Sequence, residues 1–330
     1  SSLMKLRFAL AVALIFGVLT PAPSSADAIT IGVAYDLGGR GDKSFNDATA
    51  AGLEKAKKSL DFGVEAVVTD GTSEDRDKRI RSLIAKKCAL IIAVGGGYGP
   101  TLQALAFEFP DTQFAIINDA SVAAVNVSSI IFAETQGAYL AGFSAAQISQ
   151  TGKVAMIANT NQADLFKNGF SAGVLASKKK VIPIVKYVSG SYSLAASQVI
   201  SVGADVIYLS TQGSDAEVFK VIVTNNVKKG AKKVALINIE PDQYLAVTNQ
   251  TKKYLAATVV KRVDKAIVDI ISKSLAGDQF LDYLDLDAGL FGSRYGINGG
   301  GIEFTVRSKE LLAKSDAINI AAAAAEKITA

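Results

Sequence analysis

The sequence contains no histidine and a single cysteine in 330 residues. The lack of histidine excludes Ser-His-Asp and Cys-His nucleophilic systems, HExxH metal sites and the usual zinc ligand sets. Catalysis by a carboxylate, lysine or tyrosine stays open, but it lacks the most common proton-transfer side chain. Cys88 cannot form an internal disulfide, and its apolar neighbours predict a small core residue. We therefore expect no metal, no cofactor and no enzyme.

Nucleotide and nucleic-acid motifs are also missing. No Walker A sequence occurs, and the glycine run at 95–99 does not fit G-x-G-x-x-G because Pro100 takes the last glycine position. That run indicates close backbone packing or ligand approach instead. The net charge of +4 is small, and short clusters such as Lys178–Lys180 and Lys232–Lys233 are interpreted as solvated faces. We expect no nucleic-acid partner.

The leader holds the run that most resembles a membrane segment. Lys5 and Arg7 precede the apolar stretch Phe8–Leu19, which is shorter than the roughly 20 residues that a spanning helix needs. This pattern is typical of a secretory signal peptide, residues 1–28, cleaved after Ala26 or Ala28. No cysteine lies near either cleavage site, so the sequence predicts an exported, soluble, periplasmic protein without a lipid anchor.

After the leader, short Val/Ile-rich runs alternate with longer amphipathic segments, which predicts βαβ units and parallel sheets. The pattern occurs twice, so we expect two α/β lobes, and a hydrophobic content of 49% supports an ample core. The first lobe is predicted to comprise 29–128 and about 262–290, the second 129–261 and about 291–330. The segment Ser128–Phe132 is interpreted as a crossover strand. Predicted strands are 30–34, 64–68, 90–94, 113–117, 154–158, 181–187, 206–209 and 234–237.

Open α/β sheets bind ligands beyond the carboxyl ends of their strands. Polar, glycine and aromatic residues accumulate there, and they include Asp36, Tyr98, Asn118, Asp119, Phe166, Gly213 and Glu240. The arrangement predicts a cleft between the two lobes.

The loop after the first strand, Asp36–Asn46 (DLGGRGDKSFN), is the most informative of these segments. Its glycines allow backbone to approach a ligand, and a helix starting at Ser44 would direct unpaired N–H groups to the same space. Asp36, Phe45 and Asn46 offer an acceptor, a stacking face and an amide, a set that suits a nucleoside. A structural alternative exists: Ser44 and Asp47 form a capping-box-like pair, and Phe45 fits a hydrophobic staple or a core position.

Two further residues are ambiguous on their own. Phe166 and Phe170 lie four apart on one predicted helix, so one of them should face the core. Lys261 follows an apolar run and, taken alone, would be assigned to the surface.

The segment Asp36–Asn46 matches in full the D-x-G-G-x-x-D-x-S-F-N motif of the basic membrane protein family of ABC-transporter solute-binding proteins, which includes purine nucleoside receptors. Matches continue at Phe114–Ile117, Gly137–Gly142, Thr151–Val154 and Val260–Asp264, so the resemblance covers nearly all of the mature chain. It implies the type I periplasmic binding protein fold, with two Rossmann-like lobes joined by a hinge.

The resemblance also implies roles for individual residues. Phe45 and Phe166 would sandwich the base, one from each lobe, while Asp36 bonds the base edge beside Asn46. The Gly213 backbone, Lys261 and groups at positions 118 and 240 would hold the ribose. The family usually has Asp where this chain has Asn118 and Glu240, which puts the preferred base and sugar in doubt.

The sequence thus predicts a non-enzymatic, monomeric receptor that captures a purine nucleoside (guanosine, inosine or adenosine) and delivers it to an ABC permease. A sugar or autoinducer receptor of the same fold remains an alternative, because aromatic sandwiches also hold pyranoses. A secreted nucleoside hydrolase or dehydrogenase is disfavoured by the missing histidine and nucleotide fingerprint. A membrane-attached sensor would need a spanning helix after the leader.

Overall fold

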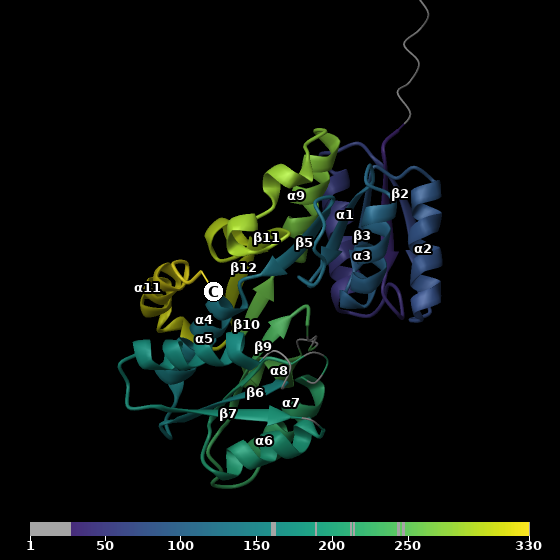
Figure 1. The fold of residues 1–330 in the computed structure, drawn as a ribbon. Helices are drawn as coiled ribbons and strands as arrows, with labels where there is room; N and C mark the ends of the chain where they lie inside the picture. The colour runs from purple at the N-terminus through teal and green to yellow at the C-terminus, as the bar shows by residue number, and fades with distance from the viewer. Residues whose placement is uncertain are drawn as a thin grey trace, which may run out of the picture.

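The computed structural model describes residues 28–159, 163–188, 190–211, 213, 215–242, 245 and 248–329. These residues form two lobes, each built on a six-stranded sheet with helices on both faces (Figure 1). The predicted leader lies outside the described residues except for its last residue, Ala28. Within the described part of the chain, no helix combines the length and apolar character needed to cross a bilayer.

The first sheet has the strand order β11-β5-β4-β3-β1-β2, and all its pairings are parallel. Its central strands are apolar and almost fully buried, as expected for a sheet covered on both faces. Helices α1 and α9 cover one face, and α2 and α3 cover the other. The elements are β1 (Thr30–Tyr35), α1 (Phe45–Lys57), β2 (Gly63–Val68), α2 (Ser73–Ala85), β3 (Leu90–Val94), α3 (Gly99–Glu108), β4 (Gln113–Ile117), β5 (Val127–Phe132), α9 (Val263–Leu275) and β11 (Gly292–Tyr295).

The second sheet has the order β12-β10-β9-β8-β6-β7, in which only β12 is antiparallel to its neighbour. Its elements are α4 (Glu134–Ile148), β6 (Lys153–Asn159), α5 (Ala163–Ala176), β7 (Ile182–Val188), α6 (Tyr192–Ser201), β8 (Val206–Leu209), α7 (Asp215–Asn226), β9 (Ala235–Glu240), α8 (Asn249–Tyr254), β10 (Leu255–Lys261), β12 (Ile302–Val306), α10 (Lys309–Leu312) and α11 (Ser315–Ala325).

Helices α4 and α5 pack against each other at very close range. A Cβ on Gly142 would lie 2.1 Å from the Phe170 carbonyl oxygen, and one on Gly173 would lie 2.0 Å from that of Tyr139. Only glycine fits at these positions, because any side chain would meet backbone.

Three connections join the lobes. The chain passes from β5 to α4 at Ala133, from β10 to α9 at Arg262, and from β11 to β12 through residues 296–301. Sheet membership therefore places two lobe boundaries later than predicted. The segment predicted as a crossover strand is β5, which pairs with β4 from Phe114 opposite Val127 onward, and β11 also belongs to the first sheet. Only Ala133 separates β5 from α4, so the sequence has no loop or change of composition that would mark this lobe boundary.

Candidate ligand-binding site

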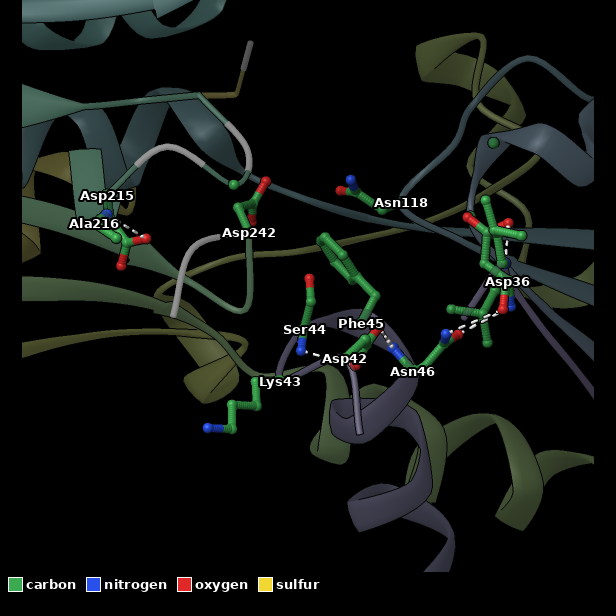
Figure 2. Close-up of a pocket in the computed structure, with 15 residues that line it drawn as sticks. Asp36, Asp42, Lys43, Ser44, Phe45, Asn46, Asn118, Asp215, Ala216 and Asp242 are labelled. Carbon is green, nitrogen blue, oxygen red and sulfur yellow. Dashed lines mark hydrogen bonds between the residues drawn. The ribbon is translucent and has the colours of Figure 1, made fainter. Parts of the chain in front are cut away.

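A cavity of about 570 Å³ lies between the lobes, at the carboxyl ends of strands from both sheets (Figure 2). Its size is within the range of small-molecule sites. The first lobe contributes Asp36, Leu37, Asp42, Lys43, Ser44, Phe45, Asn46, Val94, Gly95, Gly96 and Asn118, and the second contributes Gly213, Asp215, Ala216 and Asp242. The cleft predicted from the strand ends is present.

The N-terminus of α1 is capped by Asp42. Its carboxylate accepts hydrogen bonds from the backbone N–H groups of Ser44 (2.9 Å), Asn46 (3.1 Å) and Asp47 (3.1 Å). The predicted capping box of Ser44 and Asp47 is therefore wrong, and these N–H groups do not point unpaired into the cleft. Asp47 instead accepts from the N–H groups of Gly41 and Lys43. The hydroxyl of Ser44 is thereby released to donate across the cleft to the Pro241 carbonyl oxygen at 2.7 Å.

The Asn46 side chain holds the loop in shape. Its Oδ1 accepts from the Asp36 N–H at 3.0 Å, and its Nδ2 donates to the carbonyl oxygens of Asp36 (3.2 Å) and Gly39 (2.9 Å). Both amide hydrogens are therefore used inside the loop. Asn46 lines the cavity, as predicted, but its geometry is that of a residue that positions Asp36 and Phe45.

The two phenylalanines predicted to form a sandwich lie in different surroundings. Phe45 is 8% exposed and lines the cavity, and Figure 2 shows its ring pointing into the space between Asn118 and Asp242. Phe166 is 3% exposed and is not among the described residues that line the cavity, although Phe45, Phe166 and Phe170 all belong to the same hydrophobic core cluster. The structure brings one of the two rings to the cleft, because both Phe166 and Phe170 are packed inward.

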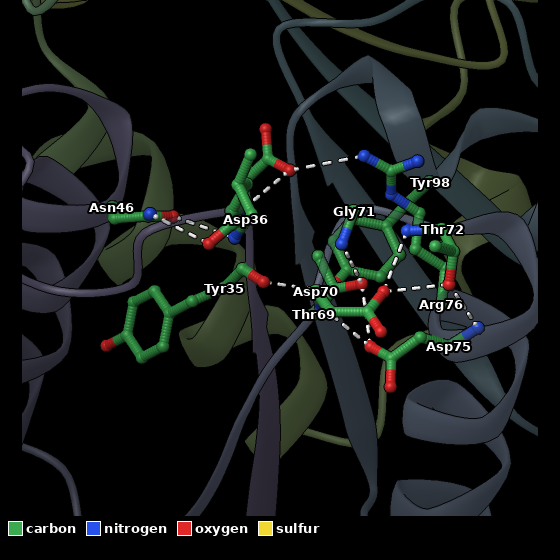
Figure 3. A network of polar contacts seen from close by, with 11 residues as sticks. Tyr35, Asp36, Asn46, Thr69, Asp70, Gly71, Thr72, Asp75, Arg76 and Tyr98 are labelled. Carbon is green, nitrogen blue, oxygen red and sulfur yellow. Dashed lines mark hydrogen bonds and ion pairs between the residues drawn. The ribbon is translucent and has the colours of Figure 1, made fainter.

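Asp36 is held by a residue that the sequence analysis missed. The guanidinium of Arg76, on α2, lies 3.5 Å from Asp36 Oδ1 and 5.7 Å from the centroid of the Tyr98 ring (Figure 3). A Cβ on Gly97 would lie 2.5 Å from Arg76 Nη2, and one on Gly95 would lie 3.0 Å from Asp36 Oδ2. The glycine run thus makes room for this pair. Tyr98 is fully buried and donates to the Tyr35 carbonyl oxygen at 2.7 Å, so it supports the site from below.

Lys261 lies at the junction of the lobes and is 2% exposed, contrary to its appearance as a surface lysine. Its Nζ is 2.7 Å from Glu134 Oε1, 2.6 Å from Asp242 Oδ1 and 3.2 Å from Asn118 Oδ1. It also lies 5.0 Å from the centroid of the Phe45 ring. One cation therefore joins the first lobe, through Asn118 and Phe45, to two carboxylates of the second.

Burial and neighbouring charge compete in this cluster. Burial would lower the pKa of Lys261, but the carboxylates of Asp242 and Glu134 outweigh it and raise that pKa, so the ammonium stays charged. Burial raises the pKa of Glu134, and the Lys261 charge only partly opposes this. One cation therefore serves two carboxyl groups, of which Asp242 also lines the cavity.

The second lobe adds Gly213 and Asp215. The Gly213 N–H donates to the Asp242 carbonyl oxygen at 3.1 Å, which fixes the loop after β8 against the one after β9. Asp215 is 4% exposed, and its Oδ2 has no hydrogen-bond donor among the described residues. Burial raises the pKa of Asp215.

Tyr98, Phe166 and Lys261 are not among the residues that line the cavity, and neither are two further predicted site residues, Glu240 and Asp119. Glu240 faces Arg307, 3.9 Å away, and burial raises its pKa. Asp119 accepts hydrogen bonds from the N–H and hydroxyl of Ser121, and so shapes the turn after β4. Within the described ranges, no group of three or more Cys, Asp or Glu side chains is arranged to hold a metal ion.

The sequence analysis missed Glu134; Asp215 and Asp242 lie in the polar strand-end segments 213–215 and 240–243 but were not chosen as ligand-binding residues. Each follows the carboxyl end of a strand, namely β5, β8 and β9. The strand-end rule therefore contained the signal for all three, whereas nothing in the charged segment Ser73–Ala85 distinguishes Arg76 from its neighbours.

Residues 29–328 match the family described as ABC transporter substrate-binding protein PnrA-like, or Bmp. The chain belongs to this family. A Bmp relative from Lactococcus lactis subsp. cremoris, named ABC transporter nucleoside-binding protein BmpA, is 26% identical over 263 residues, 74% of each chain. Another, an uncharacterized lipoprotein of Pyrococcus abyssi, is 28% identical over 293 residues, 84% of this chain and 71% of that one.

The fold of this Bmp protein is that of the type I periplasmic binding proteins. An ABC transporter solute-binding protein from Conexibacter woesei superposes with a TM-score of 0.66 at 19% identity, covering 92% of this chain and 99% of that one. The predicted fold class is confirmed: two mostly parallel α/β sheets, neither closed into a barrel. The chain is thus a solute-binding protein of the ABC transporter class.

Proposed function

We propose that this protein captures a purine nucleoside in the cavity between its lobes and delivers it to an ABC importer. The observation that carries the proposal is one buried aromatic face, Phe45, surrounded by hydrogen-bonding groups from both lobes. A flat, polar heterocycle with a hydroxylated sugar satisfies both features. The relative named as a nucleoside-binding protein supports the same ligand class.

The first lobe would recognise the base. Phe45 offers a stacking face, and contacts of that kind contribute roughly 1–3 kcal/mol per base. Asp36, held by Arg76 and Asn46, is an acceptor for a ring N–H or an exocyclic amine. This favours guanosine, inosine or adenosine. A second stacking face from Phe166 stays a prediction, which Phe166→Ala tests.

The sugar would lie toward the second lobe. Asp242 and Gly213 line the cavity on that side, Asn118 faces them from the first lobe, and Lys261 orients both Asn118 and Asp242. Charge-assisted hydrogen bonds from a carboxylate to ribose hydroxyls are short and strong. We propose Asp242 for the role that the resemblance assigned to Glu240, because Asp242 faces the cavity and Glu240 faces Arg307.

Calorimetry with a panel of ligands tests the proposal. We expect a purine nucleoside to bind and ribose, galactose and arabinose not to bind. Phe45→Ala should weaken nucleoside binding at least tenfold, whereas Phe107→Ala, an exposed phenylalanine on α3, should leave it unchanged. A sugar that binds while nucleosides do not would replace this proposal with the sugar receptor.

The absence of catalysis is tested separately. Incubation with inosine followed by chromatography should return intact inosine, and release of hypoxanthine would identify a hydrolase. The Bmp family comprises substrate-binding receptors, which supports the first outcome.

Location and assembly are part of the same proposal. We propose that the mature protein is an exported, periplasmic monomer that meets its permease at the membrane. The predicted absence of a lipid anchor differs from the lipoprotein of Pyrococcus abyssi, so mass spectrometry of the protein from its native host decides it. Size-exclusion chromatography with light scattering tests the monomer.

A further inference from the structure

Ten of the thirteen exposed lysines in the described part of the second lobe gather at the end remote from the ligand cavity. Parallel strands start along one edge of a sheet, and β10 runs from that edge toward the first lobe (Figure 1). The segments that precede β7, β9 and β10, together with the one that follows the antiparallel β12, carry ten exposed lysines. They are Lys178, Lys179, Lys180, Lys228, Lys229, Lys232, Lys233, Lys252, Lys253 and Lys309, here called the lysine face.

Several contacts show that these segments adjoin. Lys233, Lys253 and Ser308 line one cavity of about 340 Å³, and Lys252, Arg307 and Lys309 line a neighbouring one of about 540 Å³. At the other side, the Ile182 N–H donates to the Gly152 carbonyl oxygen, which fixes the turn 178–180 beside the start of β6. Strands lie about 4.8 Å apart, so six of them spread these charges over about 24 Å.

Little negative charge opposes the lysine face. None of the ten lysines forms an ion pair within the described residues. Asp205 is buried and accepts from the Ser149 hydroxyl and the Gln150 and Thr151 N–H groups, which leaves Glu310 as the exposed carboxylate among these segments. The second lobe (134–261 and 302–329) holds 18 Lys and Arg against 11 Asp and Glu. The first lobe (28–132 and 263–295) holds 14 against 19.

Exposed aliphatic side chains stand among these lysines. Four of them lie within one residue of the C-terminal ends of α5, α6, α7 and α10, at this same edge, and are 53–80% exposed: Leu175, Val202, Val227 and Leu312. These aliphatic side chains would add nothing to a surface that binds its partner through charge alone. Lysines with interspersed aliphatic groups are typical of surfaces that sit at the headgroup level of a bilayer.

We propose that the lysine face binds the surface of a bilayer rich in anionic phospholipid. Each lysine near such a surface adds to the attraction, and the aliphatic groups enter the interface. A single-stranded nucleic acid fits less well, because proteins grip it with exposed aromatic rings, and the exposed apolar residues here are aliphatic. The cavity lies at the opposite ends of the strands, so a protein held in this way keeps its cleft open to solute.

Vesicle sedimentation tests the proposal with the mature full-length chain. We compare vesicles of phosphatidylcholine alone with vesicles that contain 40% phosphatidylglycerol. The wild type should sediment only with the anionic vesicles and should be released by high salt, which screens surface charge. The variant K179Q/K229Q/K232Q/K252Q should bind at least tenfold more weakly. The matched control K57Q/K58Q/K78Q/K87Q removes four exposed lysines of the first lobe and should bind as the wild type does.

Two further measurements complete the test. Leu175→Ser with Val227→Ser keeps every charge and should weaken vesicle binding severalfold. Solute binding by all variants should be unchanged, which separates this proposal from the function of the cavity. Failure of the wild type to bind anionic vesicles, an equal loss in the first-lobe control, or tighter binding to soluble polyphosphate or oligonucleotide than to vesicles would overturn it.

Discussion

Several carboxyl groups have pKa values that are lowered in the first lobe and raised in the second. In the first lobe, hydrogen bonds from Arg262 lower the pKa of Asp264 to about 2, and the Asp70 N–H and Thr69 hydroxyl lower that of Asp75. In the second lobe, burial raises the pKa values of Glu134, Asp215 and Glu240. In the first lobe these carboxylates are stabilised by hydrogen-bond donors of the protein. In the second lobe the three carboxyl groups have too few such donors to offset the cost of burial. Hydroxyl donors of a ligand would therefore be most effective on the second lobe.

The largest effect should come from removing the cation that serves that lobe. Lys261→Met leaves Glu134 and Asp242 buried without it, and breaking such a pair costs about 3–5 kcal/mol of unfolding free energy. Urea unfolding at neutral pH measures the loss. Lys55→Met is the control, because its pair with Asp264 is partly exposed and should contribute less than about 1 kcal/mol. Similar losses in the two variants would show that the cluster is not stabilising.

The next effect concerns the scaffold of the first lobe. Asp42→Ala removes the acceptor for three N–H groups at the start of α1, so we expect a loss of about 2 kcal/mol by urea unfolding. Asp61→Ala, an exposed position in the same lobe, should change little. A loss below about 0.5 kcal/mol for Asp42→Ala would mean that water replaces this cap at little cost.

The strand-end rule led to the cavity between the lobes because it depends only on local patterns. The buried strands β1, β3 and β4 are continuous apolar runs, and the loop that begins at Asp36 follows the first of them. Sequence reasoning failed where the partner is distant. Lys261 looks like a surface residue until Glu134, 127 positions away, is folded beside it.

Local rules also failed where they allowed two answers. Asp42 and Ser44 are both residue types that cap helices, and in the structure Asp42 accepts from the N–H groups of α1 while the Ser44 hydroxyl donates to Pro241 across the cleft. Phe166 and Phe170 lie four apart, which puts both rings on the same face of α5, and both are buried; the expectation that only one of them faces the core was wrong.

A third prediction uses pH to separate the lobes. Asp264 has a lowered pKa, so it stabilises the fold above its ordinary value of 3.8, and this stability is lost as the pH falls toward about 2. Asp264→Asn should therefore cost about 1–2 kcal/mol at pH 7 and much less near pH 2.

Asp215 should behave in the opposite way. Its pKa is raised, so the native state holds the proton more tightly than the unfolded chain does, and its contribution falls as the pH rises above 3.8. Asp215→Asn should gain stability relative to the wild type over that range. Urea unfolding from pH 2 to 7 measures both variants, and parallel curves for the two would contradict the contrast between the lobes.

The smallest effect should come from the hydrogen bond between the lobes. Ser44→Ala removes the donor to Pro241, and a net contribution of about 1 kcal/mol corresponds to roughly a fivefold change in ligand affinity at most. Calorimetry with the best nucleoside measures it, and Ser59→Ala, at the far end of α1, is the matched control. A hundredfold loss would instead indicate that Ser44 contacts the ligand.

The three chain crossings at Ala133, Arg262 and residues 296–301 have a mechanical consequence. Two lobes joined by a single chain crossing could rotate in any direction and slide past each other. Three short crossings side by side allow little more than rotation about the line through them. The cavity lies close to that rotation axis, whereas the far edge of the second lobe lies a long way from it. A slight narrowing at the mouth would thus sweep the distal lysines through a much longer arc.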